Sequence, residues 1–339
     1  MDLHLIWFLL LAILFVGYAI LDGFDLGIGV LFYNLGKTEN EKRTLINSIG
    51  PVWDGNEVWL LTGGGALFAA FPFVYATVFS GFYLAMMIVL FGLIFRAVGI
   101  EYYFKCEDDP PMQRLMGKMF MIGSLIPALL FGVAMGNLVL GIPLDAEQNY
   151  VGTFFELLHP YALILGVIGL IGFLLQGASY TILKTEGDLQ QRAIKLTKTF
   201  NVTLLLAWVV GTIATFIFVP HMFDNYLAQP VLFVIPILSV VAMLMVPGMV
   251  GAQRFKAAFI TTSLIVATKF ITLAAGLFPN LVVASDPTQS LTIYNASSSD
   301  YTLTVMLVIA LIGMPIVIGY TSFVYYMFRG KASHERAGY

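Results

Sequence analysis

The sequence predicts an all-α protein, a polytopic bundle of about nine transmembrane helices that forms a single integral membrane domain over residues 1–339. Three observations support this prediction. Hydrophobic residues make up 59% of the chain and charged residues only 11%, whereas soluble domains are typically about a quarter charged. Mean hydropathy is +0.88. The apolar residues also fall in blocks of about twenty, the length of helix that crosses a hydrocarbon core about 30 Å thick.

Apolar runs separated by polar interruptions define the expected spans. In chain order they cover residues 5–33, 52–78, 80–100, 117–141, 160–183, 200–222, 229–248, 257–278 and 303–328. The connections between them are short, so the sequence predicts no soluble catalytic domain. The first run has no basic region before it and continues past any small-residue cleavage site, so we expect a true span and not a cleaved signal peptide.

The positions of lysine and arginine predict the orientation of these spans, because cytoplasmic loops retain basic residues. Sixteen of the 17 basic residues lie in or beside alternate connections or in the C-terminal segment, where they are Arg329, Lys331 and Arg336. The other connections, such as 142–159 and 279–302, contain no lysine or arginine. The sequence therefore predicts a multi-pass protein of the bacterial cell membrane with its N-terminus outside and its C-terminus in the cytoplasm, an arrangement that needs an odd number of spans.

Charge, cysteine and histidine usage exclude several functions. A net charge of only −3 gives no indication of a nucleic-acid partner, and Cys106 has no second cysteine with which to form an internal disulfide. His4, His159 and His221 lie at the outer ends of expected spans, and His334 lies in the C-terminal segment. Because no histidine pair lies within the membrane interior and no His/Cys cluster exists, we expect neither a metal site nor haem ligands in this chain.

Carboxylates inside the spans are the leading candidate functional residues, since a charge in lipid is costly unless it faces a protein interior or water. Asp22 and Asp25 lie three residues apart near the expected cytoplasmic end of the first helix, and hence on one face of it. Asp54 and Glu57 have the same spacing on the next helix. Two such pairs at one depth predict a polar region through which protons enter from the cytoplasm.

Other interpretations of these charges remain open at this point. In the alternative interpretation, the carboxylates lie at the water interface, cap the starts of helices, or form ion pairs with Lys37, Lys42 or Arg43. Arg96, at the inner end of the third span, is expected either to pair with a carboxylate, to bind the acid group of a cofactor, or to anchor the helix at the cytoplasmic surface. Trp53 is a candidate cofactor contact, with interfacial anchoring as the alternative.

Lys269 is the exception to the distribution of basic residues. It lies about twelve residues into the expected span 257–278, too deep for its side chain to reach the surface easily. It therefore needs a carboxylate partner, a polar cavity or a neutral state. We include it among the candidate proton-pathway residues, with a purely structural ion pair as the alternative.

Small residues predict where helices approach one another closely. Gly23, Gly27 and Gly29 lie between and after the first two carboxylates, and the segments 63–66 and 166–172 contain further small-residue patterns. These positions are candidates for helix contacts within the chain or with a partner.

Several motifs carry a specific resemblance to a known family. They are DGFDLGIG at 22–29, NSIGPVWDGNEVWLLTGGGALFAAFP at 47–72, YATVFSGFY at 75–83 and IFR at 94–96. These motifs closely resemble subunit II of the cytochrome bd-type quinol oxidases. Weaker similarity at 123–141, 277–280 and 290–299 extends the resemblance over the whole chain, and the block at 47–72 is too long and unusual to match by chance.

The resemblance implies a respiratory oxidase that oxidises quinol and reduces dioxygen to water. In that family subunit I carries two b-type haems, one d-type haem and the quinol site, while subunit II is a helical partner without haem ligands. The cytoplasmic proton path suggested for the family falls here on Asp25 and Asp54. Asp22 and Glu57 are added by their spacing alone, and Lys269 lies outside the matched stretches.

The resemblance also implies a mechanism and further partners. Quinol oxidation on subunit I releases protons outside and dioxygen reduction takes protons from the cytoplasm, so a proton gradient forms without a pump. Some members of the family bind a quinone-type lipid on subunit II and associate with small single-span accessory subunits. The sequence does not indicate which quinone is used or where a quinone or lipid would bind this chain.

Two other functions compete with this one. In a secondary transporter, the five ionisable residues Asp22, Asp25, Asp54, Glu57 and Lys269 would form a cation or proton-coupled site. Such sites lie near the membrane midplane between internal repeats, whereas no repeat is found and these carboxylates are expected at the cytoplasmic end. A purely structural assembly subunit differs only in that the carboxylates do not affect turnover.

Overall fold

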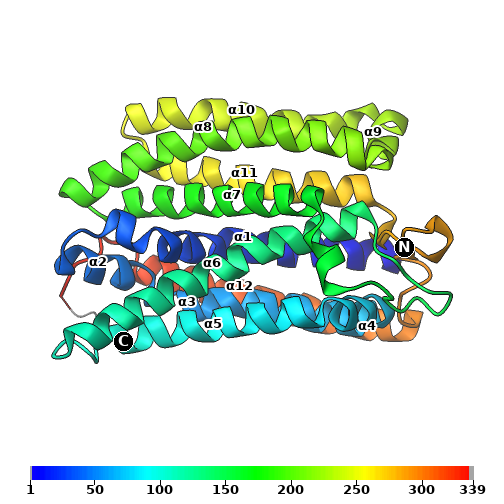
Figure 1. Ribbon diagram of the computed structural model, residues 1–339, viewed down its shortest axis with the longest axis horizontal. Helices are drawn as coiled ribbons and strands as arrows, with labels where there is room; N and C mark the ends of the chain where they lie inside the picture. Colours follow the sequence, from blue (N-terminus) through cyan, green and yellow to red (C-terminus); the bar gives the residue numbers. More distant parts are fainter. Residues whose placement is uncertain (1, 336–339) are drawn as a thin grey trace.

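The computed structural model describes residues 2–335 and consists of long helices packed side by side in layers (Figure 1). Eight helices of this part are long and apolar enough to cross a membrane. They are α1 (Leu3–Leu35), α5 (Tyr83–Tyr103), α6 (Pro110–Leu140), α7 (Pro160–Lys184), α8 (Gly187–Phe218), α10 (Val234–Gly251), α11 (Phe255–Leu277) and α12 (Asp300–Met327). A bent pair, α3 (Trp53–Ala70) and α4 (Pro72–Gly81), adds a ninth candidate crossing. The expected all-α membrane bundle is therefore confirmed.

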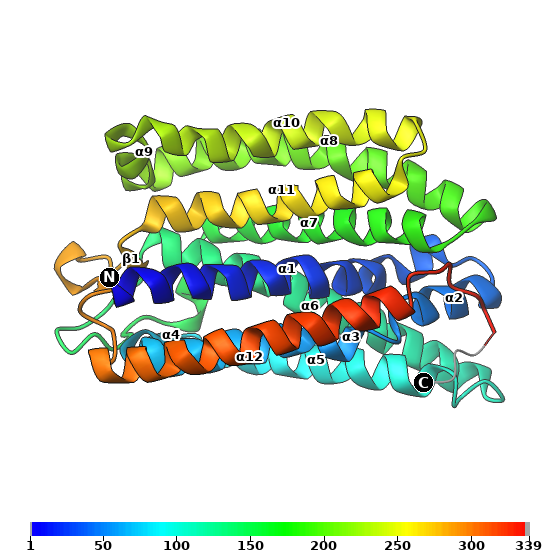
Figure 2. The ribbon, with the colours of Figure 1, turned by 180° about the vertical axis from the view of Figure 1, so that it is seen from behind.

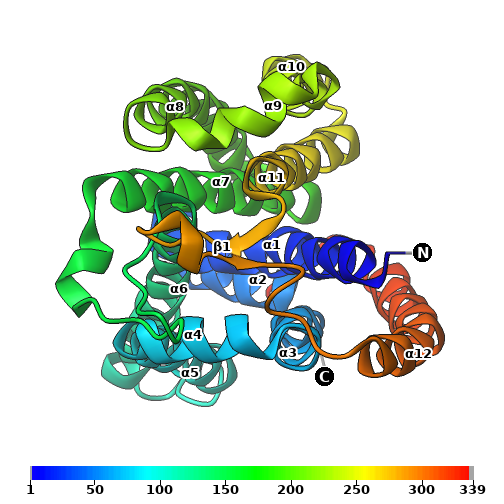
Figure 3. The same ribbon diagram turned by 90° about the vertical axis from the view of Figure 1, so that its right-hand side faces the viewer.

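The helices form successive layers that can be followed from one edge of the molecule to the other. Helices α8 and α10 lie at one edge, α7 and α11 pack beneath them, and α1 and α6 occupy the middle (Figures 1 and 3). Helices α3, α5 and α12 form the opposite edge. The N-terminus and the C-terminal segment lie at opposite ends of the bundle (Figure 2), as an odd number of crossings requires. Arg336, which belongs to the expected cytoplasmic group, lies outside the described residues.

The expected continuous span over 52–78 is wrong in its second half. Helices α3 and α4 meet at an angle of 120°, with Phe71 between them at φ −133° and ψ 66°. Pro72 causes this break, because it has no N–H to donate and its ring disfavours the helical conformation of the residue before it. The 18 residues of α3 are already about 27 Å long, so α4 turns across the outer end of the bundle (Figure 3).

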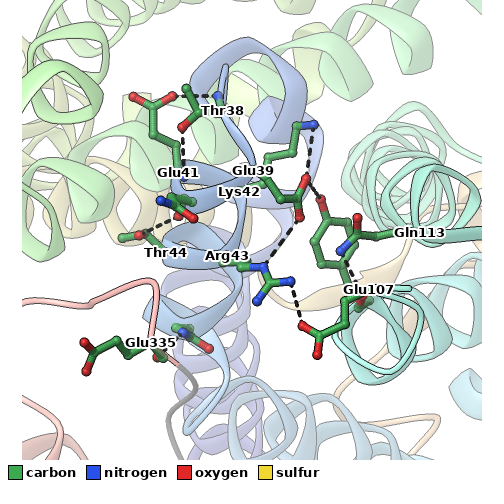
Figure 4. Close-up of polar contacts among 12 residues, drawn as sticks. Thr38, Glu39, Glu41, Lys42, Arg43, Thr44, Glu107, Gln113 and Glu335 are labelled. Carbon is green, nitrogen blue, oxygen red and sulfur yellow. Dashed lines mark hydrogen bonds and ion pairs between the residues drawn. The ribbon is translucent and has the colours of Figure 1, made fainter. Parts of the chain in front are cut away.

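A short cytoplasmic helix, α2 (Glu39–Ile49), occupies what the sequence suggested was a loop. It begins with a capping box in which the hydroxyl of Thr38 accepts from the N–H of Glu41 and the Glu41 carboxylate accepts in return. The carboxylate oxygens of Glu39 lie 3.7 Å from Nζ of Lys42 and 3.7 Å from Nε of Arg43 (Figure 4). Apolar runs alone could not reveal this helix, because it has only 11 residues and its first half is mostly charged and polar.

Helix α8 also extends further into the cytoplasmic end than expected. It begins at Gly187 and not near residue 200, so Arg192 lies on a helix. Arg192 forms an ion pair with Glu41 and donates from Nε to the carbonyl of Leu35 at 2.9 Å. These bonds attach α8 to α2 and to the end of α1.

Short elements close the outer end of the bundle. They are η1 (Phe154–Leu158), η2 (Pro220–Phe223), α9 (Asp224–Ala228), η3 (Pro230–Phe233), η4 (Pro287–Gln289) and the two-stranded antiparallel sheet of β1 (Asn280–Val282) and β2 (Leu291–Thr292). Ile142 forms a bridge to Ala284 and joins the two long outer connections. Trp7 is buried here and donates from Nε1 to the carbonyl of Leu303 at 3.0 Å.

The prediction that glycines of the first helix admit a neighbouring backbone is confirmed at Gly27. A Cβ at Gly27 would lie 2.0 Å from the carbonyl oxygen of Phe173, and one at Gly177 would lie 2.6 Å from the carbonyl carbon of Gly27. Because no side chain fits there, α1 and α7 pack backbone to backbone. By contrast, a Cβ added at Gly64 or Gly65 would meet no packed neighbour within 4 Å in the described chain.

Candidate functional site

Arg96 of α5 lies at the centre of a buried polar cluster formed by α1, α3 and α5. Its side chain has no exposed surface. It donates from Nη1 to both carboxylate oxygens of Asp22, at 2.7 and 2.8 Å, and from Nη2 to Oε2 of Glu57 at 3.0 Å. The planar guanidinium suits this bridge because its N–H groups form a rigid fork that can bind two carboxylates at once.

Asp25 lies three residues further along α1 and is also fully buried. Its Oδ2 accepts from Nδ2 of Asn56 at 2.7 Å, and Asn56 in turn accepts from the hydroxyl of Tyr325 at 2.8 Å. Asn56 also donates to the carbonyl of Leu21 at 3.2 Å. Among the described residues, the second oxygen of Asp25, Oδ1, has no hydrogen-bond partner. Asp25 is therefore held by a neutral amide and not by a cation.

The first carboxylate pair lies well inside the bundle. Helix α1 continues to Leu35, close to the expected end of the span at residue 33, so Asp22 and Asp25 lie ten or more residues, roughly 15–20 Å, before its cytoplasmic end. Both side chains are fully buried there.

The alternative in which these carboxylates pair with cations of the loop after α1 is wrong. Lys37 donates from Nζ to the carbonyl of Tyr33 at 3.1 Å. Arg43 pairs with Glu107 at 2.7 Å, as Figure 4 shows. Together with the contacts of Lys42 already described, these bonds keep the loop cations on α2 and its surroundings, away from the buried carboxylates.

The structure separates Asp54 from the cluster. Glu57 faces Arg96, and its side chain is 22% exposed, whereas Asp54 lies on the exposed surface of α3. No ion pair or hydrogen bond joins Asp54 to another side chain of the described part of the molecule. The i, i+3 spacing therefore places the two carboxylates on adjacent parts of the helix, but only Glu57 reaches the buried cation.

Lys269 belongs to α11 and lies elsewhere in the bundle, where its side chain faces α7 and α8. Its Nζ is buried and, within residues 2–335, has neither a hydrogen-bond nor a carboxylate partner. It lies 5.9 Å from the ring centre of Trp208 and faces the open backbone of Gly172. The alternative of a purely structural ion pair is therefore wrong for the described residues, and Lys269 does not contact the Arg96 cluster.

Trp53 is an internal residue and not an interfacial anchor. Its side chain is buried, and the guanidinium carbon of Arg96 lies 6.0 Å from its ring centre, within the range of a cation–π contact. Trp53 thus covers the cluster at the start of α3.

Sequence reasoning did not identify two members of this network, Asn56 and Tyr325. Asn56 carried a usable signal, because an amide between two carboxylates in an apolar block is itself unusual. Tyr325 carried none, since it is 269 residues away from its partner and α12 is rich in aromatic residues.

The described part of the chain contains no cluster of metal-binding side chains. Within residues 2–335, no group of three or more His, Cys, Asp or Glu side chains could hold a metal ion. His4 lies 3.8 Å from Asp300, and Nδ1 of His159 accepts from the N–H of Tyr161 at 3.2 Å. These two rings make local contacts at the outer end of the bundle.

Fold and site together define a multi-span helical membrane protein with a buried charged cluster between α1, α3 and α5. The sequence matches the cytochrome bd terminal oxidase subunit II family over residues 3–328, and the chain belongs to this family. It is therefore a multi-pass membrane subunit of a bacterial bd oxidase.

Relatives match along nearly the whole chain. Cytochrome bd-I ubiquinol oxidase subunit 2 of Escherichia coli K12 is 37% identical, with 98% of this chain and 96% of the relative covered. Cytochrome bd ubiquinol oxidase subunit 2 of Bacillus subtilis is 38% identical, with 98% of each covered. The fold matches a chain in the structure of bd oxidase from Geobacillus thermodenitrificans with a TM-score of 0.75 at 16% identity, covering 97% of this chain and 99% of that one.

Proposed function

We propose that this chain forms a quinol oxidase with a haem-bearing partner, subunit I, and supplies part of the route by which cytoplasmic protons reach the oxygen-reducing site. The partner holds the b- and d-type haems and oxidises quinol, releasing protons outside. Dioxygen reduction to water consumes protons drawn through this chain. A proton gradient then forms without pumping. The names of the relatives support the quinol substrate, and the buried carboxylates support the proton route.

The charge balance around Arg96 is the observation that carries this proposal. One guanidinium faces three carboxyl groups and bonds directly to two of them, Asp22 and Glu57. A third negative charge on Asp25 would have no cation in contact, and an uncompensated buried charge is costly. We therefore assign Asp25 the role of taking up and releasing a proton, while Asp22 and Glu57 hold Arg96 in place.

Asp54 fits a second position on this route, at the boundary with the partner. It lies on a face of α3 that exposes Val58, Leu61 and Phe68, which are 42%, 71% and 60% exposed. An ionised carboxylate beside such residues would be costly against lipid, whereas a protein partner with polar groups removes that cost. We therefore propose that subunit I covers this face and receives protons from Asp54. Lys269 has no part in this route, because it contacts none of these carboxylates.

Replacing Asp25 by Asn in the assembled oxidase tests the assignment. We expect quinol-driven oxygen consumption to fall about tenfold or more, since a loss of one proton-transfer group typically costs about 10²–10⁴-fold in a rate-limiting step. Haem absorption per complex should stay unchanged, and Asp25→Glu should restore part of the rate. Glu101→Gln, an exposed carboxylate on α5, is the matched control. Unchanged turnover in Asp25→Asn would leave this chain as a structural scaffold.

A further inference from the structure

A polar cavity of about 240 Å³ lies at the cytoplasmic ends of α2, α3, α7 and α12. Its rim includes exposed residues of the segment 328–335, whereas its floor includes Ser48, Val52 and Tyr180, which are 3%, 5% and 3% exposed. The cavity therefore leads from the cytoplasmic surface into the bundle. Its volume is enough for several water molecules of about 30 Å³ each.

The segment after α12 forms a wall of this cavity and is fastened by hydrogen bonds. Lys184 donates from Nζ to the carbonyls of Phe328 and Gly330. Asn47 donates to the carbonyls of Ser333 and Glu335, both at 2.9 Å. Figure 4 shows Glu335 beside α2. The same wall is held on its other side by the N–H of residue 332, which donates to the carbonyl of residue 184 at 2.8 Å.

A short chain of hydrogen bonds links the cavity to Asp25. Tyr325 lines the cavity and donates to Oδ1 of Asn56, whose Nδ2 holds Oδ2 of Asp25. An amide side chain does not relay protons readily, so Asn56 orients Asp25 and does not carry the proton itself. Oδ1 of Asp25, which is buried and has no partner among the described residues, is the atom left to receive one.

We infer that this cavity is the cytoplasmic inlet for protons that reach Asp25, and that Tyr325 and Asn56 are positioning residues that hold Asp25 behind its floor. A hydronium ion in the cavity loses one O–H bond and becomes water, while Oδ1 of Asp25 gains an O–H bond. No electron moves in this step. The inference rests on the proposed function, because it names where the proton enters the route already assigned to Asp25.

Blocking the cavity with a charged thiol reagent tests the inlet. Ala332→Cys places a thiol in the wall, and Ala257→Cys places a matched one at the cytoplasmic start of α11. Both alanines are half-buried, and Ala257 lines a separate surface hollow. Both variants are made in a Cys106→Ser background, because Cys106 is the chain's only native cysteine, and are treated with a trimethylammonium methanethiosulfonate as assembled oxidase. Mass spectrometry of the chain measures labelling.

Labelling at residue 332 is expected to slow quinol-driven oxygen consumption several-fold relative to the same variant unlabelled, and more strongly as the pH rises and protons become scarce. Labelling at residue 257 should leave the rate unchanged, and a reducing agent should restore the rate at residue 332. Complete labelling at 332 without slowing would overturn the inlet, as would failure of the reagent to reach 332 while it reaches 257.

Measuring Asp25→Asn beside these variants separates the two proposals. If Asp25→Asn retains full turnover, the proton route itself is wrong. If Asp25→Asn is slow but the blocked cavity is not, only the inlet is wrong.

The positioning role has its own test in Tyr325→Phe, which removes the hydroxyl and keeps the ring. The rate of the assembled oxidase is expected to fall at a higher pH than in the wild type, because a less firmly held Asn56 stabilises the ionised Asp25 carboxylate less. Tyr326→Phe, the exposed neighbour at 61% exposure, is the control. An unchanged pH profile in Tyr325→Phe, even with less complex recovered, would show that Tyr325 is only structural.

Discussion

At the scale of single residues, Arg96 organises the candidate site. It forms ion pairs with two carboxylates, Asp22 of α1 and Glu57 of α3. Without Arg96, both carboxylates would be unpaired charges in the membrane interior, which is costly. A lysine could not replace it fully, because a single ammonium lacks the planar fork that bridges two carboxylates.

Replacing Arg96 by Met should destabilise the chain strongly, by about 3–5 kcal/mol, because it leaves Asp22 and Glu57 as buried charges without a partner. The thermal unfolding midpoint and the yield of the purified complex measure this loss. Adding Asp22→Asn to Arg96→Met should recover part of it. Arg114→Met, at an exposed position on α6, should have little effect, and equal loss from both arginine variants would contradict the role of the cluster.

At the scale of elements, α2 depends on charge as well as on packing. Burial by itself would raise the pKa of the Glu41 carboxyl, but the hydrogen bond from Arg192 and the backbone N–H groups of Thr38 and Lys37 outweigh it, so this pKa is lowered. A lowered pKa in the folded state stabilises the fold above the ordinary value of about 4.3. That contribution is lost as the pH falls through the folded-state value.

Glu41→Gln should therefore lower the stability of the complex at neutral pH, and the difference from wild type should shrink and vanish in acid, below about pH 4. Thermal unfolding at a series of pH values measures this. Glu186→Gln, an exposed carboxylate just before α8, provides the control. A difference that persists unchanged in acid would mean that Glu41 acts by shape and not by charge.

The packing of α1 against α7 predicts a second effect at this scale. Gly177→Ala forces a Cβ to within 2.6 Å of the Gly27 backbone, so the two helices must separate, at a cost of about 1–3 kcal/mol. We expect a lower unfolding midpoint and less assembled oxidase. Gly248→Ala on α10, where nothing lies within 4 Å, should be neutral or slightly stabilising. Equal behaviour of the two variants would argue against a close α1–α7 contact.

At the scale of the whole molecule, the two edges of the bundle differ in what we expect to cover them. The α3 edge carries Asp54 among apolar side chains, whereas the α8 and α10 edge exposes apolar residues such as Leu206, at 63% exposure. A fluid lipid chain adapts to an enlarged side chain, but a packed protein interface does not.

Leu61→Trp on α3 should therefore reduce co-purification of subunit I, the partner proposed above to carry the haems, several-fold, while Leu206→Trp on α8 should leave it intact. Both are Leu→Trp changes at similarly exposed positions, 71% and 63%. The haem absorption per mole of this chain measures the outcome. If Leu206→Trp loses the partner and Leu61→Trp does not, the partner covers the opposite edge.

Much of the architecture was predictable, because each crossing helix must by itself be long enough and apolar enough to span lipid, with its backbone hydrogen bonds made within the helix. The bend at Phe71 and Pro72 was missed because the hydropathy of 52–78 is continuous across it, although the proline was a local signal. Helix α2 was missed because a capped, charged helix leaves no apolar run. In the site, Asp22 and Glu57 were found as rare charges, but Asp25 could not be distinguished from them until their partners were seen.

The sequence by itself determined the membrane class, the approximate spans, their orientation and the family, since hydropathy, basic residues and motifs are local properties of the chain. Only the tertiary structure decided which charges meet. Arg96 and Asp22 are 74 residues apart, and Tyr325 and Asn56 are 269 apart. Such contacts depend on which helix faces pack together. That packing left Asp25 without a cation, placed a cavity behind Tyr325, and left Lys269 without a carboxylate among the described residues.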